Sequence, residues 1–396
     1  VNSTLLQVTP CAFDYAMPDV MPASSFEDLL INDVPLIDTR APIEFAKGSF
    51  PAAVNLPLMS DDERAAVGTC YKQQGQDAAV ALGHRLVSGE VKAKRLAAWT
   101  AFTEQHPNGA LFCFRGGMRS AIVQQWLQQA GIHYPRVIGG YKAMRRWLID
   151  ELERLCNERA VIVVSGKTGV AKTRLLNEGN QGQPLSGAVD LEGLACHRGS
   201  AFGRRVEEQP SQINFEIAVA IAMMKSDRAS PGPLLLEDES RLIGRCALPL
   251  PLQRVIQQAP MVLVEAPLAT RVRHTHENYI LANLNDFELA AARPQGDSAA
   301  GIDAFGAFAT SLREALSRIQ RRLGGDRYGT LQAQLNEALA LHQQGDPNGH
   351  CTWIETLLRD YYDPMYEYQL SRKSNPVLFR GDYTAVADWL TTHQSG

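Results

Sequence analysis

The sequence predicts an α/β protein of two domains, an N-terminal domain and a larger C-terminal domain with a parallel sheet and added helices. At 396 residues the chain is too long for a single ordinary hydrophobic core. Uncharged apolar runs at residues 110–114 and 160–165 each lead into a glycine turn and then a helical stretch. Strands that alternate with helices in this way are typical of parallel sheets covered by helices.

The N-terminal domain is predicted over residues 13–145, and a connecting helix over residues 146–159 joins it to the rest of the chain. Its elements are expected in this order: helix 25–31, strand 34–38, strand 110–114, helix 120–129 ended by Gly131, and strand 137–140. The helix that follows, over residues 141–159, carries Lys142, Arg145 and Arg146, and we place the domain boundary within it.

The C-terminal domain is predicted over residues 160–396, with a helical region at 300–370. Its strands are expected at 160–165, 234–238, 261–265 and 376–379, and its helices from Lys172 and at 213–224, 309–323, 331–342 and 383–390. The uncharged, β-branched first strand is typical of a strand buried on both faces of a parallel sheet.

Composition narrows the class of protein. A hydrophobic content of 45% and a charged content of 21% describe a folded protein. The net charge of −4 means that any nucleic acid must bind a local basic patch. The seven cysteines are odd in number and show no C-x-x-C spacing, so neither a disulfide framework nor a zinc site is expected. No run approaches the roughly 18 apolar residues of a membrane span. We expect a cytoplasmic protein that binds no membrane.

A cysteine loop follows the apolar run that ends at residue 114. Cys113 precedes a glycine turn and a helix start, where backbone N–H groups together with Arg115 and Arg119 would stabilise a thiolate and a bound anion. We predict Cys113, Arg115 and Arg119 as catalytic residues. The predicted anion loop also contains Gly116, Gly117, Met118 and Ser120. The alternative is a buried, inert cysteine at a strand end.

The N-terminal part resembles the rhodanese family through residues 36–40, 42–45, 48–57 and the loop 113–120. In that family the loop cysteine carries a persulfide or related chalcogen, and the resemblance implies a mainly structural role for Asp38 and Arg40. The C-x5-R spacing is one residue longer than in ordinary sulfur carriers and also resembles cysteine phosphatases. The loop is therefore expected to hold a tetrahedral oxyanion such as phosphate or selenophosphate.

A second glycine loop, residues 166–173, fits the pattern G-x4-(G/A)-K-(S/T) between a strand and a helix, as in P-loop NTPases. We predict that this loop binds phosphate, with Thr173 and Asp238 as candidate Mg²⁺ ligands and no other metal site. The predicted phosphate-binding residues are Gly166, Gly169, Lys172, Thr173 and Asp238. Ala171 stands where the pattern usually has glycine, and Lys167 adds an unusual charge, so nucleotide binding is not implied.

Cations and small residues gather at residues 190–205, a stretch without clear periodicity. His197, Arg198, Gly199 and Ser200 are predicted to form a loop for a second anion, either a substrate diphosphate or an RNA backbone; the alternative is a solvated charged loop. Candidate RNA-binding residues are Lys142, Arg145, Arg146, Arg318, Arg321 and Arg322. The apolar stretch 213–224 is expected to be a core helix rather than the lining of a prenyl groove.

Nearly the whole chain resembles the bacterial tRNA 2-selenouridine synthases. The similar segments are residues 42–45, 62–75, 115–120, 139–142, 190–193, 197–203, 236–240 and 361–366. The resemblance implies that wobble 2-thiouridine of tRNA becomes 2-selenouridine, with selenophosphate and geranyl diphosphate as co-substrates and an S-geranyl intermediate. It also implies a selenophosphate-producing enzyme as a partner. Ala171 departs from the glycine usual in that family.

Two other functions fit the same motifs. One is a rhodanese-type sulfurtransferase or cysteine phosphatase with an accessory NTPase domain. The other is a non-catalytic P-loop adaptor that uses Cys113 as a redox sensor. Turnover of thiosulfate or an aryl phosphate without tRNA would favour the first, and oxidant-dependent partner binding would favour the second.

Overall fold

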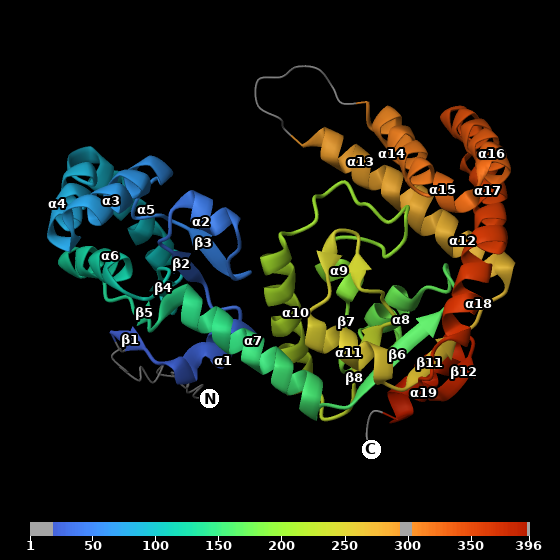
Figure 1. Cartoon of the computed structure of the whole chain (residues 1–396), viewed down its shortest axis with the longest axis horizontal. Coiled ribbons are helices and arrows are strands. Elements are labelled where there is room, and N and C mark those ends of the chain that lie inside the picture. Colours follow the sequence, from blue (N-terminus) through green and yellow to red (C-terminus); the bar gives the residue numbers. More distant parts are fainter. Residues whose placement is uncertain (1–18, 294–302, 394–396) are drawn as a thin grey trace, which may run out of the picture. The chain divides into compact units, whose positions relative to one another are not determined.

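The computed structural model describes residues 19–293 and 303–393 (Figure 1). Contacts within the chain divide it into two units, Val1–Trp147 and Leu148–Gly396, and the division falls inside helix α7 (Gly140–Glu158). The expected domain ends at residues 13–18 and 394–396 lie outside the described residues, as do residues 300–302 of the expected helical region.

The first unit contains a five-stranded parallel sheet in the order β1-β5-β4-β2-β3. Its strands are β1 (Val20–Met21), β2 (Leu36–Asp38), β3 (Ala53–Asn55), β4 (Ala110–Phe112) and β5 (Arg136–Val137). Its helices are η1 (Ala23–Ser25), α1 (Phe26–Ile31), α2 (Pro42–Ala46), α3 (Asp61–Gln74), α4 (Gln76–Leu86), α5 (Gly89–Gln105) and α6 (Met118–Gln129), followed by the start of α7. The fully buried β4 is the central strand and ends one residue before Cys113.

Two elements of this unit have ends that differ from the prediction, and glycines lie at both ends. The strand expected at residues 137–140 ends at Val137, because a turn at Ile138 and Gly139 follows it and α7 begins at Gly140; the two glycines have φ angles of 66° and 56°. The left-handed region that they occupy is strained for residues with a Cβ. The helix expected from Ser120 already begins at Met118, directly after Gly117.

The second unit contains a five-stranded parallel sheet in the order β12-β11-β6-β8-β7 and a two-stranded antiparallel sheet. The strands of the large sheet are β6 (Val161–Gly166), β7 (Ala188–Val189), β8 (Leu234–Glu237), β11 (Met261–Val264) and β12 (Val377–Gly381). The small sheet pairs β9 (Leu242–Ile243) with β10 (Cys246–Ala247). Parallel α/β architecture is therefore confirmed in both units.

Helices cover both faces of the large sheet. Ile162 and Val164 share a core cluster with residues of α8 (Lys172–Glu178) and α19 (Tyr383–His393). Because side chains alternate along a strand, the residues between them point to the opposite face. Other helices that contact the sheet are α10 (Gln212–Ala229) and α11 (Leu250–Gln258). Eight residues of α10 are buried, as expected for a core helix.

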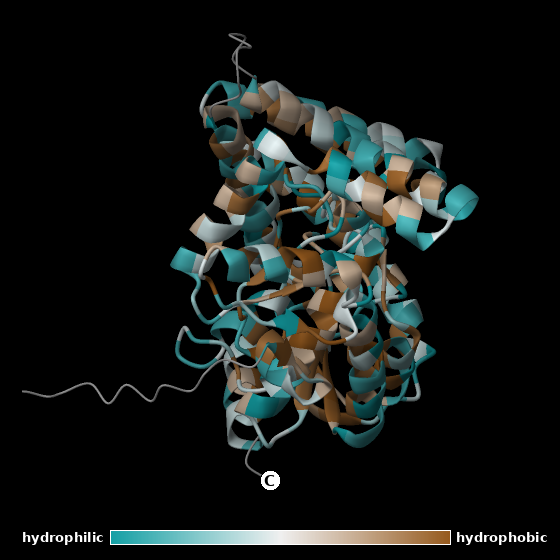
Figure 2. Cartoon of the chain, turned by 90° about the vertical axis from the view of Figure 1, so that its left-hand side faces the viewer, coloured by the Kyte–Doolittle hydropathy of each residue, from teal (hydrophilic) through white to brown (hydrophobic). Residues whose placement is uncertain are grey.

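Most of the remaining helices of this unit build a second hydrophobic core around Phe308 and Trp353. They are α12 (Leu268–His276), η2 (Glu277–Leu281), α13 (Ala282–Ala292), α14 (Ala304–Arg318), α15 (Gln320–Leu323), α16 (Gly325–Gln343), α17 (His350–Leu357), η4 (Leu358–Tyr362) and α18 (Asp363–Ser371). The two other elements are the short helices α9 (Leu191–Leu194) and η3 (Pro347–Gly349). Figure 2 shows helices that alternate between hydrophobic and hydrophilic residues, as amphipathic helices with one buried face do. Both η2 and η4 are π-helical, a form often found at functional sites.

Candidate functional site

The predicted phosphate loop connects the buried strand β6 to helix α8. The strand register places Gly166 beside Val264 and Val164 beside Glu237, so the ends of three parallel strands meet at the loop. Ligands bind at this edge of open α/β sheets. Gly169 has a φ angle of +88°, and a Cβ there would lie 2.8 Å from Thr275 Oγ1. Glycine is therefore required at Gly169 both for its backbone conformation and for the close approach of α12.

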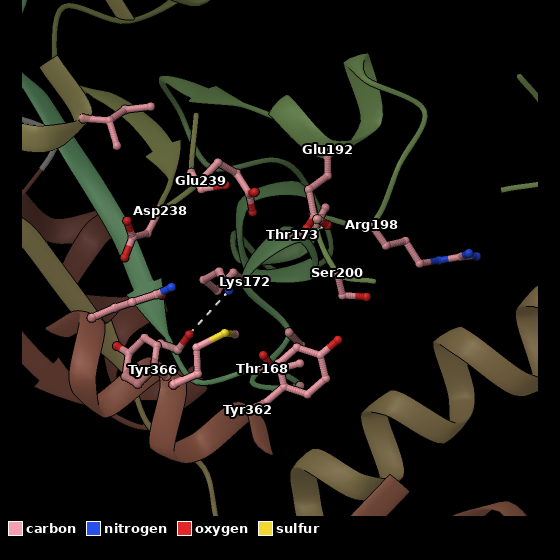
Figure 3. Close-up of a pocket in the computed structure, with 18 of the residues that line it drawn as sticks. Thr168, Lys172, Thr173, Glu192, Arg198, Ser200, Asp238, Glu239, Tyr362 and Tyr366 are labelled. Carbon is pink, nitrogen blue, oxygen red and sulfur yellow. Dashed lines mark hydrogen bonds between the residues drawn. The ribbon is translucent and has the colours of Figure 1, made fainter. Parts of the chain in front are cut away.

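Lys172 lies half-buried in the loop, with its Nζ 3.4 Å from the carbonyl oxygen of Gly166 (Figure 3). Burial alone would favour the neutral amine. The surrounding carboxylates nevertheless raise the pKa of Lys172 above its ordinary value, and they are Glu239, Glu192, Glu237 and Asp238. Lys172 is therefore a cation at neutral pH and is placed to pair with a phosphate group.

Thr173 contacts two buried carboxylates that the sequence analysis did not assign. Its Oγ1 lies 2.5 Å from Glu237 Oε1 and 2.9 Å from Glu192 Oε2. Burial raises the pKa of both glutamates, and it acts with the charge of Glu192 to raise the pKa of Glu239 to about 8. The Lys172 ammonium group therefore lies among several carboxyl groups whose pKa values are raised.

Asp238 does not contact Thr173, which differs from the expected pairing. Its Oδ2 accepts a hydrogen bond of 2.5 Å from Ser165 Oγ, and its Oδ1 pairs with Lys373. Successive residues at a strand end point to opposite sides, so Glu237 takes the place beside α8 that the sequence analysis gave to Asp238.

The oxygen atoms around Thr173 suit a hard divalent cation. Hydroxyl and carboxylate oxygens are the ligands that Mg²⁺ prefers, and it is usually bound by one or two carboxylates together with substrate phosphates. Within the described residues no group of three or more His, Cys, Asp or Glu side chains forms a metal site by itself. Thr173, Glu237 and Glu192 therefore fit Mg²⁺ that arrives with a phosphate ligand.

The loop predicted for a second anion lies against this site. Gly199 has a φ angle of +55°, and a Cβ there would collide with Glu192. Figure 3 shows Ser200 near the phosphate loop, whereas the guanidinium of Arg198 points away from Lys172. Arg198 instead bonds Asn283 Oδ1 at 3.2 Å and Asp286 Oδ2 at 3.4 Å. Burial, reinforced by nearby arginines, lowers the pKa of His197 to about 4, so it is neutral at pH 7.

The phosphate loop and the loop at 197–200 open into one cavity of about 1000 Å³. Tyr362, Met365, Tyr366 and Tyr368, from η4 and α18, also line it, and the Tyr366 hydroxyl lies 3.3 Å from Ser165 Oγ, directly before the phosphate loop. No residue of α10 lines this cavity, in agreement with a core role for residues 213–224. The cavity combines an anion cradle with an aromatic wall, as small-molecule sites commonly do.

The predicted cysteine loop lies between β4 and α6 of the first unit. Cys113 is 3% exposed, and its Sγ lies 3.2 Å from Ser120 Oγ. The amides of Tyr141 and Lys142 donate to the carbonyl oxygens of Cys113 and Phe114 at 3.0 and 2.9 Å. The start of α7 therefore fixes the loop, while the first N–H groups of α6 remain outside intrahelical bonding.

The two predicted catalytic arginines have different environments. Arg115 is exposed. Arg119 forms hydrogen bonds of 2.6 and 3.2 Å with the carboxylate of Glu44. Although burial opposes ionisation, Arg119 holds the pKa of Glu44 below its ordinary value. Asp38 and Arg40 form a buried ion pair of 2.6 Å, as expected of structural residues.

The predicted RNA-binding residues belong to both units. Lys142 and Arg146 are exposed on α7, where Arg145 is half-buried. Arg321 and Arg322 are exposed on α15. Arg318 of α14 donates a hydrogen bond of 3.0 Å to the carbonyl oxygen of Ala201.

Sequence reasoning missed Glu192, Glu237 and Glu239 as parts of the site. All three fall in segments that carry the family resemblance, 190–193 and 236–240, but their spacing alone assigns them no role. Tyr362 and Tyr366 lie almost 200 residues after the phosphate loop and also fall in a segment that carries the family resemblance, 361–366, but their spacing alone does not place them at the loop.

Comparisons with known proteins identify the family. The model of the tRNA 2-selenouridine synthase AAA domain matches residues 159–396. A tRNA 2-selenouridine synthase of Hahella chejuensis is 52% identical and covers 96% of this chain and 97% of its own length. The corresponding protein of Marinobacter nauticus is 48% identical, over 93% of this chain and 97% of its own length. A solved N-terminal domain from Clostridium difficile 630 is 30% identical with a TM-score of 0.30, over 33% of this chain and 98% of that domain. The chain belongs to the tRNA 2-selenouridine synthase family.

Proposed function

We propose that the chain converts 2-thiouridine at the wobble position of tRNA into 2-selenouridine. Selenophosphate is the selenium donor, and geranyl diphosphate forms an S-geranyl intermediate. The relatives' name supports the tRNA product. The single observation that carries the diphosphate step is the half-buried, charged Lys172, which lies in a glycine loop and lines the cavity.

In the first step the thiocarbonyl sulfur attacks C1 of the geranyl group. A C–S bond forms, the C–O bond to diphosphate breaks, and the uridine loses its N3 proton. Backbone N–H groups of the phosphate loop and Lys172 stabilise the departing diphosphate. Mg²⁺ bound with the diphosphate near Thr173 would neutralise part of its charge. The aromatic wall of Tyr362 and Tyr366 offers apolar surface to the geranyl chain.

In the second step selenium replaces sulfur. Alkylation has converted the thiocarbonyl into a thiolate leaving group, so the selenium of selenophosphate can add at C2, form a C–Se bond and expel geranyl thiolate. Water then cleaves the P–Se bond, which releases phosphate and leaves 2-selenouridine. We assign this step to the rhodanese-like N-terminal domain, where Cys113, Arg115 and the N–H groups at the start of α6 bind selenophosphate. Arg119 holds Glu44 and therefore positions this loop. A selenophosphate-producing enzyme is the proposed supplier of the donor.

Reconstitution of the purified chain tests the proposed function. Thiolated tRNA and geranyl diphosphate, without ATP, are expected to yield S-geranyl-2-thiouridine, and added selenophosphate is expected to yield 2-selenouridine. Mass spectrometry of the tRNA nucleosides measures both products. Turnover of thiosulfate or an aryl phosphate with unmodified tRNA nucleosides would instead identify a sulfurtransferase or phosphatase. No turnover of any substrate would favour the redox-sensing adaptor.

A further inference from the structure

Four arginines of the second unit gather around the loop at 197–204. We call Arg198, Arg204, Arg205 and Arg318 the arginine cluster. His197 and Arg204 form an antiparallel bridge that closes the loop, and Arg318 of α14 is tied to it through the carbonyl oxygen of Ala201 at 3.0 Å. Two arginines of the cluster therefore lie in the loop, Arg205 follows directly after it, and the fourth comes from a separate helix.

The cluster has few negative partners. Glu314 lies 3.9 Å from Arg204 and 4.0 Å from Arg318, and Asp286 lies 3.4 Å from Arg198. Both carboxylates are largely solvated, with 58% and 40% of their side chains exposed. Within the described part of the chain, Nε of Arg205 and Nδ1 of His197 are buried without a hydrogen-bond partner. Surface ion pairs of this length contribute little, so the cluster retains a strong attraction for an added anion.

The cluster extends from the cavity to the surface. Arg198 and Arg205 line the cavity, whereas the side chain of Arg204 is 67% exposed and that of Arg318 is 42% exposed. In Figure 3 the guanidinium of Arg198 points away from Lys172, so it does not face an anion bound in the phosphate loop. The arginine cluster is thus a positive region separate from Lys172, and it lies at the edge of the cavity that Lys172 also lines.

We propose that the arginine cluster binds the phosphate backbone of the tRNA beside the target uridine, so that the base enters the cavity. Guanidinium groups match phosphate in a two-pronged geometry, and several phosphates in sequence can use several arginines. A wobble base already lies in a loop, so little energy is needed to extrude it. This inference rests on the proposed function, because only a tRNA-modifying enzyme needs to hold RNA at the edge of the cavity.

Binding of thiolated tRNA to the full chain at several salt concentrations tests the inference. Arg204→Ala removes an exposed side chain and leaves the fold intact. We expect it to weaken binding about fivefold or more, and to lower the slope of log affinity against log salt by about one. Arg204→Ala combined with Arg205→Ala is expected to have a larger effect. Arg313→Ala is the matched control, because Arg313 is exposed on the same helix as Arg318 but bonds Asn336 at 3.0 Å.

Calorimetry with inorganic pyrophosphate separates this inference from the proposed function. Arg204→Ala is expected to bind pyrophosphate as the wild type does, and Lys172→Ala is expected to lose that binding. An unchanged salt slope in Arg204→Ala, or an equal loss in Arg313→Ala, would overturn the arginine cluster as an RNA site. Weaker pyrophosphate binding with unchanged tRNA binding would also overturn it. Failure of the wild type to modify tRNA would count against the proposed function alone, since tRNA binding is measured without turnover.

Discussion

Ala171 occupies the left-handed region of the backbone, with φ 67° and ψ 45°, at the start of α8. This conformation costs an L-residue about 1–2 kcal/mol, and glycine avoids that cost but loses more entropy on folding. We therefore predict that Ala171→Gly raises the free energy of unfolding by up to about 1 kcal/mol. Urea denaturation measures the change.

Ala171→Val is the control for that prediction. A β-branched residue is more strongly disfavoured at positive φ, so it is expected to lower the free energy of unfolding by more than about 1 kcal/mol. Equal stability of the glycine, alanine and valine variants would show that the left-handed conformation is absent from the folded protein.

At the residue scale the sequence predicts a loop whose geometry is set by local backbone residues better than it predicts which distant side chains contact that loop. Glycine spacing after a buried strand identifies Lys172 and Thr173, because the loop geometry is encoded within eight residues. Glu192 and Glu237 reach Thr173 from 19 and 64 residues away, so their place depends on sheet order and register. The hydrogen bond between Arg119 and Glu44, which are 75 residues apart, likewise depends on the tertiary fold.

Helix α18 forms one ion pair with α12 and another with the phosphate loop, and the two pairs differ in how far they are buried. Asp363 makes two bonds of 2.7 Å with Arg271, whose side chain is 4% exposed. Removing one partner of a buried pair leaves an uncompensated charge, so Asp363→Ala is predicted to lower the free energy of unfolding by about 3 kcal/mol. Thermal or urea denaturation provides the measurement.

Glu367, one turn later on the same helix, is the matched control. It pairs with Lys167 at 2.6 Å but is 64% exposed. Glu367→Ala is therefore expected to cost less than about 1 kcal/mol. If the two variants lose equal stability, the buried pair does not anchor α18.

His350 gives the helical region a predicted sensitivity to acid. It is fully buried, accepts a hydrogen bond from Trp353 at 2.9 Å, and contacts His342 at 3.2 Å. Burial, together with the charges of His342 and His276, lowers the pKa of His350 from 6.5 to about 3. Below pH 6.5 this histidine is therefore protonated in the unfolded chain but stays neutral in the folded chain. The free energy of unfolding consequently falls as the pH falls.

The loss attributable to His350 is at most about 2 kcal/mol between pH 6.5 and pH 5. His350→Gln keeps an acceptor for Trp353 but cannot titrate, so its unfolding free energy should depend less on pH over this interval. Denaturation at several pH values measures the two slopes. Identical slopes for wild type and variant would contradict a neutral, buried His350.

At the element scale the sequence predicted four strands of the large sheet, β6, β8, β11 and β12, and missed features that depend on tertiary contacts. The β-branched run at 160–165 became β6, and the late strand at 376–379 became β12, paired with β11. The π-helical segments η2 and η4 were not predicted, because the same residues also suit an ordinary helix. Tyr279 of η2 donates a hydrogen bond of 3.0 Å to the carbonyl oxygen of Arg198, a tertiary contact that the local sequence does not encode.

At the scale of the whole molecule, the two predicted anion loops have the same local structure. Each follows a buried central strand, turns through glycine with positive φ, and begins a helix. One loop contains a thiol and the other an ammonium group, which suits them to different reagents. No helix among the described residues is long and apolar enough to cross a membrane.

The division of labour between Cys113 and Lys172 is the central claim, and nucleoside mass spectrometry of two variants tests it most directly. With thiolated tRNA, geranyl diphosphate and selenophosphate, Cys113→Ala should accumulate S-geranyl-2-thiouridine and form no 2-selenouridine, whereas Lys172→Ala should form little of either. With selenophosphate and tRNA that already carries S-geranyl-2-thiouridine, Lys172→Ala should form 2-selenouridine and Cys113→Ala should not. Equal loss of both steps in both variants would contradict two separate sites.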